Sequence, residues 1–112
     1  MKRIYVFISF LVLTLSVRSA AQCLQNDIIL ASQAEVDDFN TDYPNCKSIL
    51  GTFSIIGADI TNLDGLSQLT AVGHLIIKNN PVLTNLNGLT ALTISGGLSI
   101  ENNAALTTIN GL

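Results

Sequence analysis

The sequence is short of the residues on which most enzyme and nucleic-acid sites depend. Its 112 residues include no tryptophan, one histidine, two cysteines and five lysines and arginines against eight acidic residues. So little positive charge disfavours nucleic acid and anionic lipid as partners, because binding them requires lysine and arginine to neutralise phosphate. One histidine and two cysteines also leave no set of residues for a nucleophilic triad. The length suits one small domain.

The first 21 residues have the features of a secretory signal peptide. Lys2 and Arg3 form a basic start, residues 4–17 form an apolar run, and residues 19–21 supply the small side chains that a signal peptidase reads. We therefore expect residues 1–21 to be removed before Gln22. The mature protein is then expected to be secreted or displayed at the cell surface.

Two other interpretations of this segment stay open. A membrane anchor needs about 20 apolar residues, whereas this run has 14. A lipoprotein would carry its lipid on Cys23, but Gln22 stands where a small residue normally precedes the modified cysteine. We expect no membrane insertion after removal of the signal. Removal would leave Lys47 and Lys78 against eight acidic residues, a net charge of −6.

A pattern with a period of 23 residues runs through the second half of the chain. The motif [LI]-[ND]-G-L occurs at residues 63–66, 86–89 and 109–112. Between these motifs, an L-x-I step occurs at residues 75–77 and again at 98–100. Because the step has period 2, both of its apolar side chains point to one face of a short strand.

Two asparagines follow each of these strands, Asn79–Asn80 and Asn102–Asn103. Asparagine tolerates left-handed backbone and its side chain bonds to nearby backbone groups, so each pair can turn the chain. We expect the asparagines to be structural turn residues whose side chains bond from one repeat to the next.

A degenerate first copy precedes these repeats, with Phe53 and Ile55 in the places of the later L-x-I steps. The predicted strands are residues 53–56, 75–78 and 98–101. Their alternation predicts that Leu75, Ile77, Leu98 and Ile100 point inward. A period of 20 to 29 residues with Leu-x-Leu and asparagine is typical of a leucine-rich solenoid, in which each repeat forms one coil of a parallel stack. A helical repeat would need apolar residues at i, i+3, i+4 and i+7, and these are missing.

Residues 22–50 differ from the repeats and are expected to cap them. Ser32 to Glu35 has the S-x-x-E form of a helix capping box, and we predict a short helix over residues 33–40. Residues 28–30 are predicted to form a short strand. Cys23 and Cys46 lie in the same part of the chain, and export makes a disulfide between them the default expectation. A metal or redox site at this pair is the weaker alternative, since no histidine lies near them.

Taken together, these motifs resemble those of bacterial secreted leucine-rich-repeat proteins of the receptor L-domain type. The resemblance covers residues 23–112 and includes the SQAEVDDF segment, the YPNC segment and the L-x-I-x-N-N-P-x-L-T-N-L-N-G-L repeat. It implies a mainly β fold, a right-handed parallel β-solenoid with several sheets and a short N-terminal capping helix. Residues 51–112 would form the solenoid coils. No ligand residue carries over from the family, and His74 stands where the family pattern has glycine.

No candidate catalytic set emerges, and we expect a protein that is not an enzyme and has no cofactor. Asp37 and Asp38 fall on the predicted helix as a solvated face, while Asp59 and Asp64 fall on different bends. Calcium is the best-matched metal for turns rich in Asp and Asn, but no aspartate recurs from copy to copy. His74, the only histidine, is expected to be a surface substitution, with ligand contact or pH sensing as the alternative.

Two classes of function remain open. The first is an extracellular or cell-surface binding or adhesion module for a protein or glycan ligand, and the second is a structural spacer in a larger surface protein. The residues after Phe53 contain no aromatic side chain, which disfavours sugar stacking there and adds weight to the spacer. The third repeat ends at Leu112 without a capping segment, so we expect a fragment, the N-terminal part of a longer repeat protein. Further repeats of the full-length chain would then be its partner.

The expected disulfide can be measured directly. Mass spectrometry of the exported protein without reductant should find Cys23 and Cys46 joined, since the closed loop would stabilise the fold by about 3 kcal/mol through the unfolded state. Two alkylatable thiols in the folded protein would contradict the pairing.

Overall fold

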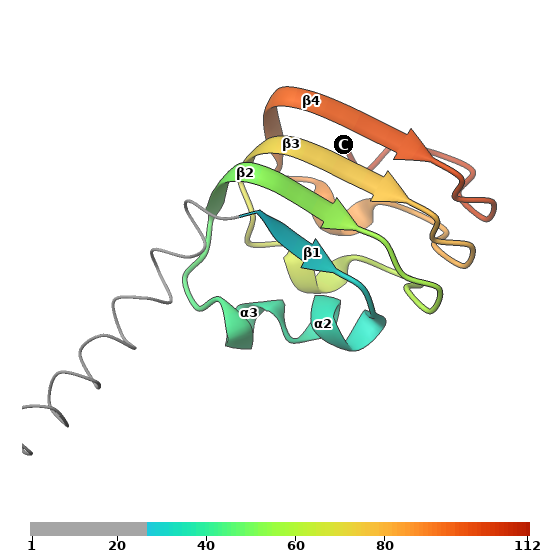
Figure 1. Ribbon diagram of the computed structural model, residues 1–112, viewed down its shortest axis with the longest axis horizontal. Coiled ribbons are helices and arrows are strands. Elements are labelled where there is room, and N and C mark those ends of the chain that lie inside the picture. The colour runs from blue at the N-terminus through green and yellow to red at the C-terminus, as the bar shows by residue number, and fades with distance from the viewer. Residues whose placement is uncertain (1–26) are drawn as a thin grey trace, which may run out of the picture.

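The computed structural model describes residues 27–112, and the expected signal peptide and Cys23 lie outside this range. The described residues contain one parallel sheet of four strands in the order β1-β2-β3-β4 (Figure 1). The strands are β1 (Ile28–Leu30), β2 (Ser48–Ile55), β3 (Ala71–Lys78) and β4 (Thr93–Glu101). Two short helices, α2 (Gln33–Asp37) and α3 (Phe39–Asp42), follow β1. Single 3₁₀ turns, η1 (Asp64–Leu66) and η2 (Asn87–Leu89), follow β2 and β3.

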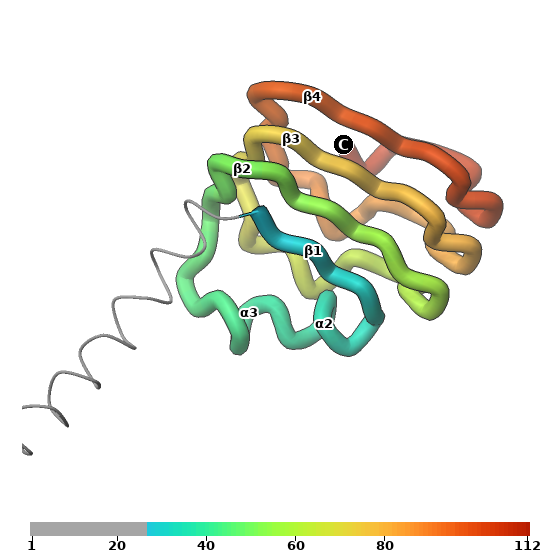
Figure 2. The backbone as a smooth tube through the Cα atoms, viewed as in Figure 1, coloured from blue at the N-terminus to red at the C-terminus, as the bar shows by residue number. Residues whose placement is uncertain are grey.

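The repeats seen in the sequence lie beside one another in the structure. Phe53 pairs with Leu75 and Leu75 with Leu98, so residues at equivalent repeat positions are neighbours across the sheet. After each of β2, β3 and β4 the chain turns at the same end of the sheet and returns along one side of it (Figure 2). We call one strand together with the segment that follows it a layer.

The strands are longer than the sequence predicted, because each begins several residues earlier. Gly73 lies within β3, and Gly96 and Gly97 lie within β4. The register between these strands shifts by one residue between Val72 and His74. The ring of His74 packs against Gly96 and Gly97, since a Cβ at either glycine would lie within 3 Å of a ring atom. The paired glycines therefore make room for the histidine that replaces glycine in the preceding layer.

The N-terminal segment forms the predicted strand and a capped helix. The hydroxyl of Ser32 accepts a hydrogen bond from the backbone N–H of Glu35 at 3.2 Å, and the Glu35 carboxylate accepts one from the N–H of Ala31 at 2.7 Å. In a standard capping box the second bond comes from the N–H of the N-cap residue, here Ser32; in this helix it comes from Ala31, one residue earlier. The helix predicted over residues 33–40 is interrupted at Asp38 and continues as the separate turn α3.

The apolar core lies between the sheet and the helices and returning segments. Phe39 of α3 contacts both Tyr43 and Phe53, with ring centroids 5.0 and 5.8 Å apart. Val36 and Phe39 are fully buried, so α2 and α3, which follow β1, cover the layer of β2. Gln33 fixes α2 to the next layer, because its side-chain oxygen accepts a hydrogen bond from the backbone N–H of Thr61 at 2.7 Å.

The expected right-handed parallel β-solenoid with several sheets is wrong for residues 27–112. These residues form a small fold with a single four-stranded parallel sheet, and their returning segments contain 3₁₀ turns and irregular chain. The physical reason lies in the leucine spacing. Leu83, Leu86 and Leu89 are three residues apart and all buried, and the chain around them is irregular except for the 3₁₀ turn at Asn87–Leu89. A second sheet would need the period of 2 that only the strand segment has.

The returning segments approach one another through glycine. A Cβ on Gly88 would overlap the carbonyl oxygen of Leu63, and one on Gly111 would overlap that of Leu86. The motif [LI]-[ND]-G-L therefore recurs because backbone lies directly against backbone at this point of each layer.

Burial separates two leucines that occupy the same repeat position. Leu75 is fully buried, whereas Leu98 is 48% exposed. We predict that Leu75→Ala lowers the free energy of unfolding by about 3 kcal/mol because it opens a cavity in a packed site. Leu98→Ala should cost about 1 kcal/mol or less, since its side chain already contacts water. Urea denaturation of the two variants checks this, and equal costs would contradict the burial difference.

Candidate functional site

The two asparagine pairs turn the chain at the carboxyl ends of β3 and β4. Asn79 and Asn102 both have φ of 56°, in the left-handed region that asparagine enters more easily than most residues. The structure thus places Asn79, Asn80, Asn102 and Asn103 at equivalent turns, with the first asparagine of each pair bending the backbone.

The second asparagine of each pair joins neighbouring layers. The side-chain oxygen of Asn80 accepts a hydrogen bond from the N–H of Gly57 at 2.8 Å, and its amide nitrogen donates one to the carbonyl oxygen of Ile55 at 2.9 Å. Asn80 is fully buried. Because buried backbone groups without partners are costly, this side chain keeps the turn after β2 satisfied.

Asn103 repeats the arrangement one layer further on. Its oxygen accepts hydrogen bonds from the backbone N–H of Asn80 at 3.0 Å and from the Asn80 side chain at 2.9 Å. Its amide nitrogen donates to the carbonyl oxygen of Ile77 at 2.9 Å. Asn103 is only half-buried, because no segment of residues 27–112 lies over its layer.

The layer that contains β4 exposes the apolar positions that the preceding layer buries. Leu98, Ile109 and Leu112 are 48%, 58% and 39% exposed, whereas their counterparts Leu75, Leu86 and Leu89 are at most 1% exposed. Ile100 and Leu106 are partly buried. We name this set the β4 end surface, comprising Leu98, Ile100, Leu106, Ile109 and Leu112.

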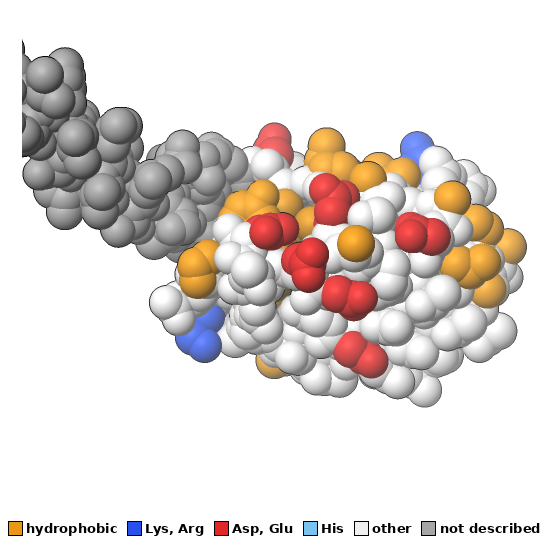
Figure 3. Space-filling model, turned by 90° about the horizontal axis from the view of Figure 1, so that it is seen from below, with side chains coloured by type: hydrophobic (Ala, Val, Ile, Leu, Met, Phe, Trp, Pro, Cys, Tyr) orange, Lys and Arg blue, Asp and Glu red, His pale blue; other side chains and the backbone are white. Residues whose placement is uncertain are grey.

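Charge is unevenly distributed between the two sides of the described chain. Residues 27–64 contain seven of the eight acidic residues and one lysine, while residues 65–112 contain only Lys78 and Glu101 as charged groups. Lys78 and Glu101 face each other at 3.8 Å across β3 and β4. Several acidic side chains gather on the face seen from below, where α2 and α3 lie (Figure 3). The β4 end surface is therefore close to neutral.

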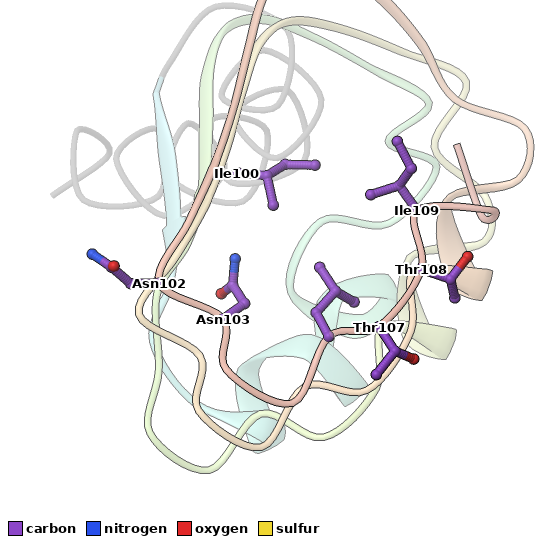
Figure 4. Close-up of a pocket in the computed structure, with 7 residues that line it drawn as sticks. Ile100, Asn102, Asn103, Thr107, Thr108 and Ile109 are labelled. Atoms are coloured by element: carbon purple, nitrogen blue, oxygen red, sulfur yellow. The ribbon is translucent and has the colours of Figure 1, made fainter.

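A groove of about 490 Å³ opens on the β4 end surface. It is lined by Ile100, Asn102, Asn103, Leu106, Thr107, Thr108 and Ile109. In the close-up, Ile100 and Asn103 point toward the inside of the layer, while Asn102 and Thr108 point away from it (Figure 4). The groove thus combines three apolar side chains with four polar ones, two asparagines and two threonines.

Most of the other residues that the sequence singled out have structural contacts or stay exposed. Asp59 accepts a hydrogen bond from the N–H of Gln33 at 3.1 Å, and Asp37 accepts one from the side chain of Gln33 at 2.9 Å. Cys46 is 3% exposed and is not a free cysteine. Its expected partner, Cys23, lies outside the described residues, so the disulfide stays a prediction.

Residues 27–112 contain no group of three or more His, Cys, Asp or Glu side chains that could hold a metal ion. His74 is exposed on β3, and Asp64 is exposed at the start of η1. Within the same part of the chain, no helix is long and apolar enough to cross a membrane.

Comparison with known proteins gives no assignment. No family model matches the chain, and neither a curated protein nor a solved structure matches it.

Two features of the site escaped the sequence analysis. Thr107 and Thr108 line the groove. Thr107 occupies a repeat position that Thr61 and Thr84 also occupy, and Thr108 stands where those copies have Asn62 and Asn85, but nothing in the sequence indicated that they line a groove. Gln33 joins α2 to the layer of β2, because its side-chain oxygen accepts hydrogen bonds from the backbone N–H groups of Thr61 and Asn62. Such a contact between residues 28 positions apart depends on the tertiary arrangement.

The two inter-layer asparagines should differ in their contribution to stability. Asn80→Ala leaves the N–H of Gly57 and the carbonyl of Ile55 buried without their side-chain partner, and it should lower the free energy of unfolding by about 3 kcal/mol. Asn103→Ala should cost about 1 kcal/mol, because water reaches its half-buried site. Thermal and urea unfolding of both variants test the order, and a larger cost for Asn103→Ala would contradict it.

Proposed function

We propose that this protein is an extracellular or cell-surface, non-enzymatic binding module whose ligand docks on the β4 end surface. The observation that carries the proposal is the contrast between two equivalent layers. Side chains that are buried in the layer of β3 are exposed in the layer of β4, beside a groove and a strand edge that no described residue pairs. Exposed apolar groups beside an unpaired strand edge are typical of surfaces that bind another strand.

The chemistry of the surface favours a protein ligand over a glycan. Sugar sites commonly stack a ring on an aromatic side chain, and residues 54–112 contain no aromatic residue. The groove instead offers isoleucine and leucine beside two asparagines and two threonines. An extended segment with alternating apolar side chains would pair its backbone with β4 and place those side chains on the end surface.

The export expected from the N-terminal residues, and the resemblance to secreted leucine-rich-repeat proteins, support placing this function outside the cell. The alternative function is a structural spacer with no ligand of its own. The absence of aromatic anchors from residues 54–112 favours that alternative, because binding hot spots are rich in Tyr and Trp.

A peptide with the sequence of residues 71–83 tests the binding function. This segment contains β3, which in the folded protein pairs with the opposite edge of β4. Its apolar residues have the same spacing as those of the end surface. Fluorescence anisotropy of the labelled peptide should show saturable binding to the purified protein. A matched control peptide with Leu75→Ser, Ile77→Ser and Leu83→Ser should not bind.

A variant of the protein locates the site. Ile109→Asp places a charge at a position that is 58% exposed, so it should abolish peptide binding and leave the fold intact. Failure of the parent peptide to bind, or equal binding by the two peptides, would contradict the binding function and favour the spacer.

A further inference from the structure

We propose that Asn87, which Gly88 follows in the chain, is a site of spontaneous deamidation, and that the fold accepts the aspartate product but not the isoaspartate product. This modification is separate from the proposed binding function and does not rest on it. The reaction needs no other protein, because the nucleophile is the backbone nitrogen of Gly88 and the co-reactant is water.

The modification takes place in two chemical steps. The backbone nitrogen of Gly88 attacks Cγ of the Asn87 side chain, and a new C–N bond closes a five-membered imide. The bond from Cγ to Nδ2 breaks, and the side-chain nitrogen leaves as ammonia after taking up the proton of the Gly88 N–H. Water then opens the imide at one of its two carbonyl groups, which gives aspartate or isoaspartate. Glycine favours the first step, because it has no Cβ to obstruct the approach of its nitrogen.

The side chain of Asn87 is open to this reaction. It is exposed at the start of η2, so water reaches the amide. Among residues 27–112, no hydrogen bond holds this side chain. The side chains of Asn80, Asn85 and Asn103, by contrast, are each held by a hydrogen bond. Asn87 therefore combines a following glycine with an amide that is free to turn toward it.

The contact between layers holds the reacting atoms apart in the folded protein. Ring closure requires Cβ of Asn87 and the nitrogen of Gly88 to be nearly eclipsed about the Cα–C bond, and the helical dihedrals of a 3₁₀ turn do not give that arrangement. Rotation about this bond moves Gly88, which is buried so tightly that a Cβ on it would lie 1.8 Å from the carbonyl oxygen of Leu63. Deamidation therefore requires local opening between the layers of β2 and β3.

The preceding layer supports the fit of aspartate at this position. Asp64 has in η1 the place that Asn87 has in η2, and both side chains are exposed. The backbone N–H of Asp64 donates to the side-chain oxygen of Asn62 at 3.1 Å. The N–H of Asn87 donates in the same way to Asn85 at 3.0 Å. Aspartate at position 87 therefore keeps the turn and adds one negative charge.

Isoaspartate does not fit at the same position. Its peptide link runs through the side-chain carbon, so the backbone before Gly88 becomes longer by one methylene group, or about 1.5 Å. Gly88 would then move from a contact that has no room for a methyl group beside the Leu63 carbonyl. A chain with isoaspartate at position 87 therefore loses this contact between layers and is less stable.

Peptide mapping of the aged protein tests the inference. The full chain is incubated at mildly alkaline pH, folded in one sample and in denaturing urea in the other. Cleavage after Lys78 and Glu101 then places Asn87 in a fragment of its own, apart from Asn110, and electron-transfer fragmentation distinguishes aspartate from isoaspartate. Deamidation at Asn87 is expected in both samples, at a rate about tenfold or more lower in the folded protein, because opening a buried contact costs free energy.

Two variants and a protease separate the products. Asn87→Gln keeps the amide but would have to close a larger ring, so it should show no conversion at position 87. Asn87→Asp should unfold at the same urea concentration as the wild-type protein. When the urea-aged sample is refolded and treated briefly with protease, chains with isoaspartate should be cleaved first. Absence of conversion at Asn87, equal rates in the two samples, a lower urea midpoint for Asn87→Asp, or equal protease resistance of the two products would each overturn the inference.

Discussion

The structure depends on the bonds that asparagine makes between one layer and the next. At the turns after β2 and β3, backbone groups point toward the neighbouring layer and are buried from water. The fully buried side chain of Asn80 pairs these groups: it accepts a hydrogen bond from the N–H of Gly57 and donates one to the carbonyl oxygen of Ile55. This buried amide also fixes the register between the two layers. A shift by one residue would leave both the amide and its backbone partners without hydrogen bonds. Leucine packing then fills the space that this register defines.

Two kinds of contact hold the layers at one spacing. The asparagines act at the carboxyl ends of the strands, and the close approach of Gly88 to Leu63 acts on the returning side. Between them, buried leucines tolerate small adjustments, as side chains in cores do. The polar and backbone contacts therefore specify the arrangement, while the apolar side chains supply most of the free energy.

The sequence predicted those parts of the fold that depend on local chemistry. The cap strand over residues 28–30 and a helix begun by Ser32 are present, because strand alternation and helix capping act over a few residues. The number of sheets was predicted wrongly, since the returning segments form irregular chain with single 3₁₀ turns and no strands. Leu98 matched Leu75 in sequence and differs in burial, because burial depends on what lies over a layer. Thr107 has counterparts at Thr61 and Thr84 in the preceding repeats, but only the tertiary arrangement places it at a groove.

The close backbone contact at glycine has a consequence for how the length of such a chain can vary. A Cβ fits at neither Gly88 nor Gly111, and the same contact recurs at one point in every layer. An inserted or deleted residue in the returning segment would move glycine away from this point and put a side chain against a carbonyl. Duplication of a whole layer would reproduce every contact at once. The chain can therefore lengthen by complete repeats more easily than by single residues, and the turns after the strands, where the first repeat is one residue shorter, are where exceptions are tolerated.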